Sequence, residues 1–370
     1  MRADVLRRWA VVAAGLTVLC AMPVIASALP ATVPALTASQ LRARILASTG
    51  QSYTGYAESN ATFGLPSLPG LNGVASLLDG VTKMRVWVAS PDDWRVDVLS
   101  DAGERDTYQL GAVSYIWDSG QELLTEVDGQ PSLRLPRPAD LVPPALAVRL
   151  LAAAGAQASF GLIPPLRVAG QSVAGLRVTP TDASSTIGHV DIWAEPGSGL
   201  PLMVEIFGRD SASPALESQF FQIGRWRPDR GVLTPQRGPG TGFTMTSARS
   251  LAGALSHLAL EILPAELAGR DEVPGPPGFG TVSIYGGGLA TFVVVGARTS
   301  QDLIGDALSA GGTALSLPGA RGALIGAPLV NAVLVQPSGF ALTFLIVGTV
   351  SPGVLEQAGA TLVADRVWLP

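Results

Sequence analysis

Apolar and polar residues alternate along much of the first 224 residues, with the period of two that is typical of β-strands. The clearest case is WRVDV at 94–98, where Trp94, Val96 and Val98 fall on one face of the predicted strand. Alternation and strand-forming composition predict strands over 53–60, 84–90, 94–98, 103–110, 112–119, 121–127, 172–180, 187–195, 201–208 and 216–223. Short strands joined by tight turns predict an antiparallel sheet, and their polar alternate positions predict that it is covered on one face only.

Two stretches with helical character can supply that cover. Residues 37–48 place apolar side chains on one side of a predicted helix, and residues 138–155 begin with a proline turn and end in an apolar helix. The segment 63–73 contains Pro and Gly that prevent regular structure, yet it is rich in Leu and Phe, and 74–80 predicts a short helix. A cover that packs imperfectly over an apolar sheet leaves an apolar pocket.

The composition of the chain changes after residue 224. Residues 225–244 are rich in Pro, Gly and Arg, which is typical of an interdomain linker. Beyond them the pattern predicts strands at 281–286, 289–296, 331–337 and 340–348, and helices at 300–310 and 352–362. The sequence therefore predicts an N-terminal segment (1–28), a first domain (29–224), a linker (225–244) and a small α+β domain (245–370).

The first 28 residues have the layout of an export signal. Arg2, Arg7 and Arg8 precede the apolar run 9–28, which ends in the small-residue sequence Ala-Ser-Ala. This run predicts a cleaved secretory signal, and its length of about 20 residues leaves an uncleaved membrane anchor as the alternative. The positive charges at its start place the rest of the chain outside the cytoplasm in both cases. Cys20 follows a bulky Leu, which does not fit a lipid-attachment signal.

Composition excludes several classes of function. Hydrophobic residues make up 47% and charged residues 14% of the 370 residues, so the chain can bury a large core. The net charge is −5 and no cluster of Lys or Arg follows Arg8, so the sequence predicts no nucleic-acid partner. The only cysteine, Cys20, lies in the N-terminal run, which excludes disulfides and cysteine-based sites from residues 29–370.

The sequence also carries no pattern that points to catalysis, a cofactor or a metal. His189 and His257 lie on unrelated segments, and neither a nucleophile elbow nor a phosphate-binding loop is present. Asp92-Asp93 and the pair Asp191 and Glu195 are read as solvated or ion-paired carboxylates. We therefore expect a binding protein without a cofactor, and an envelope hydrolase is disfavoured.

Four stretches resemble the LolA/RseB superfamily: SYTGYAES (52–59), MRVWVASPDDWRVDVLSDAGERDTYQLGAVSYIWD (84–118), VAGLRVTP (173–180) and VDIWAEPGSGLPLMVEI (190–206). The resemblance covers residues 38–224. That superfamily includes outer-membrane lipoprotein carriers, RseB/MucB-type regulators of extracytoplasmic sigma factors and lipid-binding lipoproteins. The resemblance implies an unclosed antiparallel half-barrel with helices over its concave face and an apolar cavity for acyl chains. The RseB/MucB regulators also carry a smaller C-terminal domain, similar in placement and size to 245–370.

On this interpretation the apolar stripe of the strands forms the cavity wall and the loop after residue 62 forms a gate. The predicted wall is Val86, Val88, Trp94, Val96, Val98, Val113, Tyr115, Trp117, Val190, Ile192, Leu202, Val204 and Ile206, and the predicted gate is Phe63, Leu65 and Leu68. The alternative is an ordinary core with a buried plug, because a core and an apolar pocket use the same residue types.

The sequence thus predicts an exported protein that holds lipid or the acyl chains of a lipoprotein, as a carrier or as a sensor. The alternative is a regulator of an extracytoplasmic-function sigma factor. In that case the C-terminal domain would contact a membrane-bound anti-sigma factor or another membrane protein, and the two-domain layout favours this reading.

Overall fold

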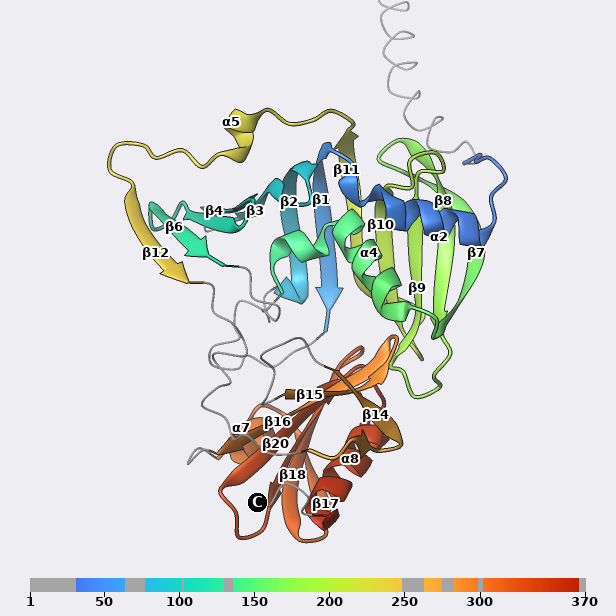
Figure 1. The fold of residues 1–370 in the computed structure, drawn as a ribbon, viewed down its shortest axis with the longest axis vertical. Coiled ribbons are helices and arrows are strands. Elements are labelled where there is room, and N and C mark those ends of the chain that lie inside the picture. The colour runs from blue at the N-terminus through green and yellow to red at the C-terminus, as the bar shows by residue number, and fades with distance from the viewer. Residues whose placement is uncertain are drawn as a thin grey trace, which may run out of the picture.

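The computed structural model describes residues 31–63, 77–101, 103–129, 136–247, 263–274, 282–298 and 302–365. These residues build a twelve-stranded sheet and an eight-stranded sheet (Figure 1). Within the described ranges no helix is long and apolar enough to cross a membrane. The predicted export signal, His257, Leu65 and Leu68 lie outside the described residues.

The larger sheet has the order β12-β6-β5-β4-β3-β2-β1-β11-β10-β9-β8-β7 and does not close into a barrel. Its strands are β1 (Tyr53–Thr62), β2 (Asp79–Ser90), β3 (Asp93–Ser100), β4 (Gly103–Leu110), β5 (Val113–Asp118), β6 (Leu123–Asp128), β7 (Ala158–Val168), β8 (Gln171–Pro180), β9 (Ile187–Ala194), β10 (Pro201–Gly208), β11 (Pro214–Gly224) and β12 (Gly242–Ser247). All neighbours pair antiparallel except β12, which lies parallel to β6. The predicted α+β class, with an open antiparallel sheet covered by helices on one face, is confirmed.

Two helices cover one face of this sheet (Figure 1). Helix α2 (Ala38–Ala47) continues into the short 3₁₀ turn η1 (Ser48–Gly50), and α4 (Pro143–Ala154) follows the 3₁₀ turn η2 (Pro138–Leu141). Thr37 caps α2 reciprocally: its hydroxyl accepts from the Gln40 backbone N–H, and the Gln40 side chain accepts from the Thr37 N–H. Leu41 and Ile45 of α2 are fully buried and belong to the same core as the strands.

Two edge elements depart from the pattern that predicted the rest. Strand β7 was not predicted, because Pro164 and Pro165 interrupt its alternation, and its position at the edge explains how prolines are tolerated. The segment 225–244, predicted as a linker, contains the one-turn helix α5 (Arg230–Leu233) and the start of β12. It therefore adds a strand to the larger sheet before the chain reaches the smaller one. The division into two domains stays a prediction.

The smaller sheet has the order β13-β14-β15-β16-β20-β19-β18-β17. Its strands are β13 (Glu266–Leu267), β14 (Arg270–Val273), β15 (Val282–Gly287), β16 (Ala290–Arg298), β17 (Thr313–Leu317), β18 (Ala320–Gly326), β19 (Asn331–Pro337) and β20 (Leu342–Gly348). Helix α8 (Pro352–Asp365) shares a core with Val333 and Val335, whereas α7 (Leu303–Ser309) shares one with Leu334. Because neighbouring residues of a strand point to opposite faces, the two helices cover opposite faces of this sheet.

The two parts of the chain touch through the loop between β8 and β9. Ser185 forms a β-bridge with Val350, and the Ser351 N–H donates to the Ser184 carbonyl over 2.7 Å. Arg270 of β14 pairs with Asp182 at 2.7 Å. Hydrogen bonds, a bridge and an ion pair therefore fix the orientation of the second sheet relative to the first.

Candidate functional site

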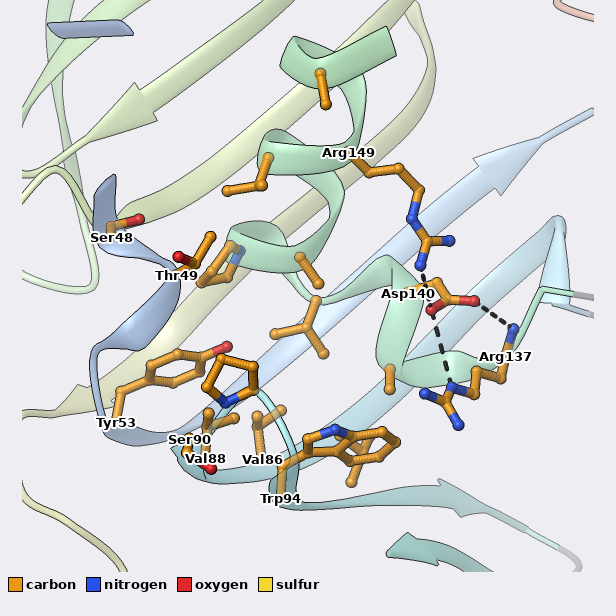
Figure 2. A pocket seen from close by; sticks show the side chains of 18 residues that line it. Ser48, Thr49, Tyr53, Val86, Val88, Ser90, Trp94, Arg137, Asp140 and Arg149 are labelled. Carbon is orange, nitrogen blue, oxygen red and sulfur yellow. Dashed lines mark hydrogen bonds and ion pairs between the residues drawn. The ribbon is translucent and has the colours of Figure 1, made fainter. Parts of the chain in front are cut away.

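A cavity of about 410 Å³ lies between one half of the larger sheet and helix α4 (Figure 2). Its size falls within the range of small-molecule sites, about 300–1,000 Å³. The lining residues are Ser48, Thr49, Tyr53, Val86, Val88, Ser90, Pro91, Trp94, Val96, Arg137, Ala139, Asp140, Val142, Pro144, Ala145, Val148, Arg149 and Ala152. Most of this wall is apolar, and its polar groups gather at the ends.

The sheet side of the cavity is built by cross-strand pairs of β2 and β3. Val86 lies opposite Val96, and Val88 lies opposite Trp94, so that all four side chains project from the covered face. These four residues of the predicted cavity wall therefore do meet at one cavity. Helix α4, from Pro144 to Ala152, and the turn η2 form the opposite side.

The second half of the predicted wall forms ordinary core. Val190, Ile192, Leu202 and Val204 are fully buried and Ile206 nearly so, in the cluster that also contains Leu41 and Leu151. None of these strand residues lines the cavity. Val98 is partly buried against the same core. Helices α2 and α4 pack closely over β8–β11, whereas over β2 and β3 the cover leaves a gap.

The predicted residues of β5 lie on the other face of the sheet. Tyr115 is paired with Tyr108, and Tyr108 with Arg95, so Tyr115 shares the face of Arg95 and not that of Trp94. Trp117 and Val113 follow Tyr115 by alternation. The sequence grouped these three with Trp94, and the register corrects that grouping. The residues of β5 that share the face of Trp94 are Ser114, Ile116 and Asp118.

The described part of the predicted gate is buried. Phe63 belongs to the core of the first domain, and its N–H donates to the Leu78 carbonyl over 3.2 Å. Leu65 and Leu68 lie outside the described residues, so a gate at this loop stays a prediction.

The polar end of the cavity is formed by Arg137, Asp140 and Arg149, which the sequence did not single out. Asp140 accepts from the Arg137 backbone N–H and from Arg149 Nη2, each at 3.0 Å. The Arg137 guanidinium lies 4.7 Å from the centre of a Trp94 ring, within cation–π range. The proline turn at Pro138 predicted the start of a helix, but nothing in the sequence connected Arg137 to a strand residue 43 positions earlier.

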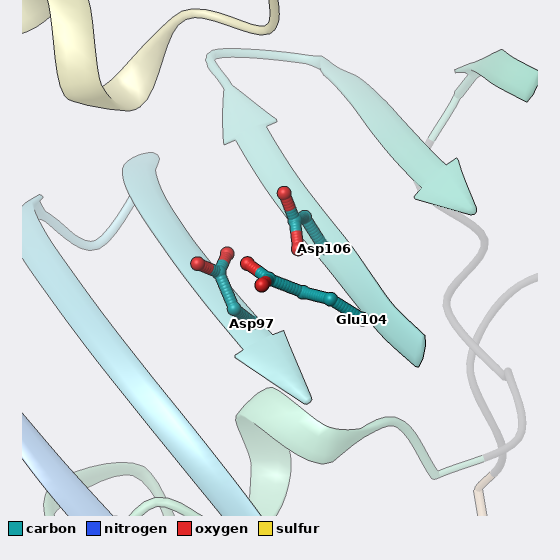
Figure 3. Close-up of side chains that lie close together, drawn as sticks. All are labelled: Asp97, Glu104 and Asp106. Carbon is teal, nitrogen blue, oxygen red and sulfur yellow. The ribbon is translucent and has the colours of Figure 1, made fainter. Parts of the chain in front are cut away.

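On the uncovered face, three carboxylates of β3 and β4 point toward one another (Figure 3). Asp97, Glu104 and Asp106 bring oxygens within 4.8 Å of one another, an arrangement that could hold a cation. Arg95 bonds Asp97 Oδ1 at 2.6 Å and Asp106 Oδ2 at 2.8 Å, and Arg85 lies 2.6 Å from Glu104. Because the guanidiniums of Arg85 and Arg95 already pair with all three carboxylates, the arrangement fits an ion-pair network better than a metal site.

The electrostatics of that network are unusual for a surface. Burial raises the pKa of Asp97 to about 7, against the opposing effect of its hydrogen bond from Arg95. Arg95 also donates to the Val232 carbonyl in α5 over 3.4 Å. The segment that follows β11 therefore covers part of the charged cluster, which explains how carboxylates on the outer face become buried.

Of the carboxylates considered in the sequence, Asp191 and Glu195 are ion-paired. Asp191 is held by Arg177 through two hydrogen bonds of 2.7 and 2.6 Å, and Glu195 pairs with Arg225. His189 stacks on Phe207 with ring centres 4.3 Å apart, and burial lowers its pKa. These contacts explain Asp191, Glu195 and His189 as structural residues of the outer face.

Comparisons with known proteins place the chain as follows. No protein-family model and no curated protein matches the sequence. The crystal structure of MucB in complex with MucA(peri) matches at 17% identity and a TM-score of 0.48, covering 87% of this chain and 97% of that chain. The Pseudomonas aeruginosa MucA/MucB complex matches at 18% identity and a TM-score of 0.48, covering 87% and 96%. A LolA superfamily protein from Nitrosomonas europaea matches at 11% identity and a TM-score of 0.26, covering 54% and 99%.

Structures of MucB and of a LolA superfamily protein, which come from the superfamily that the sequence resembles, are among these matches. At these identities the matches concern the fold.

Proposed function

We propose that this protein binds an apolar or lipid-like ligand in the cavity between β2, β3 and α4, outside the cytoplasm. The observation that carries the proposal is the cavity itself, because a volume of about 410 Å³ with a mostly apolar wall lies where the cover of the sheet leaves a gap. Burying methylene groups there would supply about 0.8 kcal/mol for each CH₂ before the costs of ordering and association.

Export to the cell envelope and the role of carrier or sensor for lipid or lipoprotein acyl chains belong to the same proposal. The Arg-flanked apolar run 9–28 supports export. An apolar ligand of the envelope would then reach the cavity without crossing the cytoplasm.

Helix α4 offers a matched pair of variants for the test. Ala145 lines the cavity and is exposed, so Ala145→Phe should fill the cavity without overpacking the core. Ala153 lies on the same helix, is also exposed and does not line the cavity. Ala153→Phe therefore changes the surface of the helix by the same amount and leaves the site open.

The experiment is native mass spectrometry of protein purified from its own membrane fraction. We expect lipid to co-purify with the wild type and with Ala153→Phe, and to be reduced in Ala145→Phe. Equal lipid in all three proteins would place any ligand elsewhere. A wild type without lipid that also takes up none on titration would remove the proposal.

A second candidate function is regulation of an extracytoplasmic-function sigma factor through contact with a membrane-bound anti-sigma factor. The observation that favours it is the second sheet, which is held against the first by the Ser185–Val350 bridge and the Asp182–Arg270 pair. A carrier needs no such attachment, whereas a sensor needs a path from its ligand site to a partner. Pull-down with the full chain against envelope membrane proteins, with and without lipid, tests it.

A further inference from the structure

Charge is distributed unevenly along the cavity. Arg137, Asp140 and Arg149 are the charged residues among those that line it, and all three lie at one end (Figure 2). Two guanidiniums against one carboxylate leave this end with a net positive charge. The remaining lining residues are neutral, so nothing else within the cavity wall offsets it.

Asp140 fixes the geometry of this end. Its side chain is almost fully buried and accepts from the Arg137 backbone N–H and from Arg149 Nη2. A buried carboxylate is costly unless it is paired, so Asp140 requires these donors and holds them in place. The contact with Trp94 adds a second restraint on Arg137. The fold therefore holds the guanidiniums of Arg137 and Arg149 in place at this end of the cavity.

Arg149 retains unused donor capacity. A guanidinium carries five N–H donors, and among the described residues Arg149 makes one hydrogen bond, to Asp140. Its side chain is 58% exposed, so it stands at the rim where the cavity meets solvent. An anion at the rim could accept from the remaining donors without displacing Asp140.

The opposite end of the cavity is polar but has no charged lining residue, and two of its hydroxyls already donate hydrogen bonds. Ser48 Oγ donates to the Ile45 carbonyl over 2.7 Å, and Ser90 Oγ donates to Asp93 Oδ2 over 3.4 Å. A charged group placed at that end would face the Asp93 carboxylate. Charged lining residues therefore occur at one end only, and this difference sets a direction for a ligand with one charged end.

The geometry points to an anionic amphiphile as the ligand: an acyl chain that ends in a carboxylate or a phosphate monoester, with the anionic head held by Arg149 at the rim. The tail lies across Val88 and Trp94 under α4. This inference rests on the proposed function, since it assigns the head group of the same ligand. Arg137 and Asp140 act as positioning residues that hold Arg149 and the wall in place.

The test compares ligands that share one tail and differ in the head. Titration calorimetry of the full chain in a non-ionic detergent uses dodecanoate, dodecyl phosphate and uncharged dodecanol, together with inorganic phosphate alone. We expect the two anions to bind about tenfold more tightly than dodecanol, as one charge-assisted hydrogen bond provides. Inorganic phosphate alone should not bind measurably, because without a tail it gains nothing from the apolar wall.

Substitutions at Arg149 test whether this residue causes the preference for anionic ligands. Arg149→Gln should remove the preference for anions and leave the affinity for dodecanol unchanged, and Arg149→Lys should restore part of it. Arg321 in the second sheet is the matched control, because its side chain is 56% exposed and also pairs with an aspartate. Arg321→Gln should bind all ligands as the wild type does.

The outcomes separate this inference from the proposed function. Equal affinity for charged and uncharged tails, unchanged in Arg149→Gln, overturns the head-group assignment while the lipid site stands. Binding of inorganic phosphate as tight as that of dodecyl phosphate overturns the amphiphile in favour of a free anion. Failure of every tail to bind overturns both the inference and the proposed function.

Discussion

Ser218 of β11 donates a hydrogen bond of 2.5 Å to the carbonyl of Leu141, and both residues are buried. This contact connects the sheet to the turn η2, which carries Asp140 and leads into α4. The wall of the cavity that the helix provides is therefore attached to the sheet by a polar contact as well as by apolar packing.

Loss of that hydrogen bond should destabilise the protein. Ser218→Ala leaves the buried Leu141 carbonyl without its donor, and we expect the free energy of unfolding to fall by about 1–3 kcal/mol. Ser59 is the control: it lies directly opposite Ser218 on β1 and is buried, and its hydroxyl has no hydrogen-bond partner among the described residues. Ser59→Ala should cost little. Urea denaturation of both variants checks the difference, and equal losses would show that the contact contributes nothing.

A larger side chain should reduce lipid uptake when it is placed in the cavity, and should reduce stability when it is placed in the core. Val96→Trp places a large side chain where the cavity offers room, so lipid uptake should fall while stability changes little. Val204→Trp places the same side chain in the closed core and should cost about 1–3 kcal/mol or more. Thermal unfolding and fatty-acid titration of the two variants separate the cases. Lipid binding that survives Val96→Trp while stability collapses would make this face ordinary core.

Glu205 should make the protein less stable as pH rises. Burial, with help from the neighbouring Glu217 and Asp191, raises the pKa of Glu205 from 4.5 to about 7. Between these values the folded state holds a proton that the unfolded state has released, so stability falls as pH rises through this window. Glu205→Gln should flatten the profile and gain about 1 kcal/mol at pH 8, given that solvent screens a half-buried group. Denaturation midpoints of the wild type and of Glu205→Gln, measured from pH 5 to pH 8, test this prediction. A variant profile identical to that of the wild type would exclude Glu205 as the cause of the pH dependence.

The two parts of the chain should stay associated after cleavage between 225 and 244. Arg270 lowers the pKa of Asp182 to about 2, so this ion pair persists at neutral pH and is lost only as pH falls from about 4 through 2. Limited proteolysis followed by size-exclusion chromatography should give co-eluting fragments for the wild type. Arg270→Ala should release a larger share of separate fragments, and Arg321→Ala should not. A chain without a protease-sensitive site in 225–244 would contradict the predicted domain boundary.

Export can be measured directly. Alkaline phosphatase fused after Pro370 should be active in intact cells, because residues 29–370 are expected outside the cytoplasm. Deleting residues 2–28 should abolish the activity. An inactive full-length fusion, produced at normal levels, would contradict export and the envelope ligand with it.

Alternation was sufficient to predict most strands of the larger sheet, since period two is strong in segments such as 94–98. Alternation did not predict which residues of different strands lie on the same face of the sheet. Trp94 and Trp117 each belong to an apolar row within their own strand, but whether the two rows share a face depends on the register of β3, β4 and β5. A register shift of one residue moves every side chain of a strand to the opposite face.

The sequence also could not predict which residues of the covered face form the core and which line the cavity. Val96 and Val204 are both buried valines in alternating strands, but Val96 lines the cavity and Val204 does not. Arg137 and Arg149 became recognisable as site residues once the fold brought them to Trp94 and Asp140. Sequence spacing gave no sign of either contact.

Pro164 and Pro165, whose presence kept β7 from being predicted, also affect whether copies of the protein can associate through this strand. An open sheet ends in edges whose N–H and C=O groups can recruit another strand, and growth from such an edge is a route to aggregation. Proline has no N–H to offer, so β7 presents an interrupted row of donors at this edge. Polymerisation of copies through the β7 edge is therefore disfavoured.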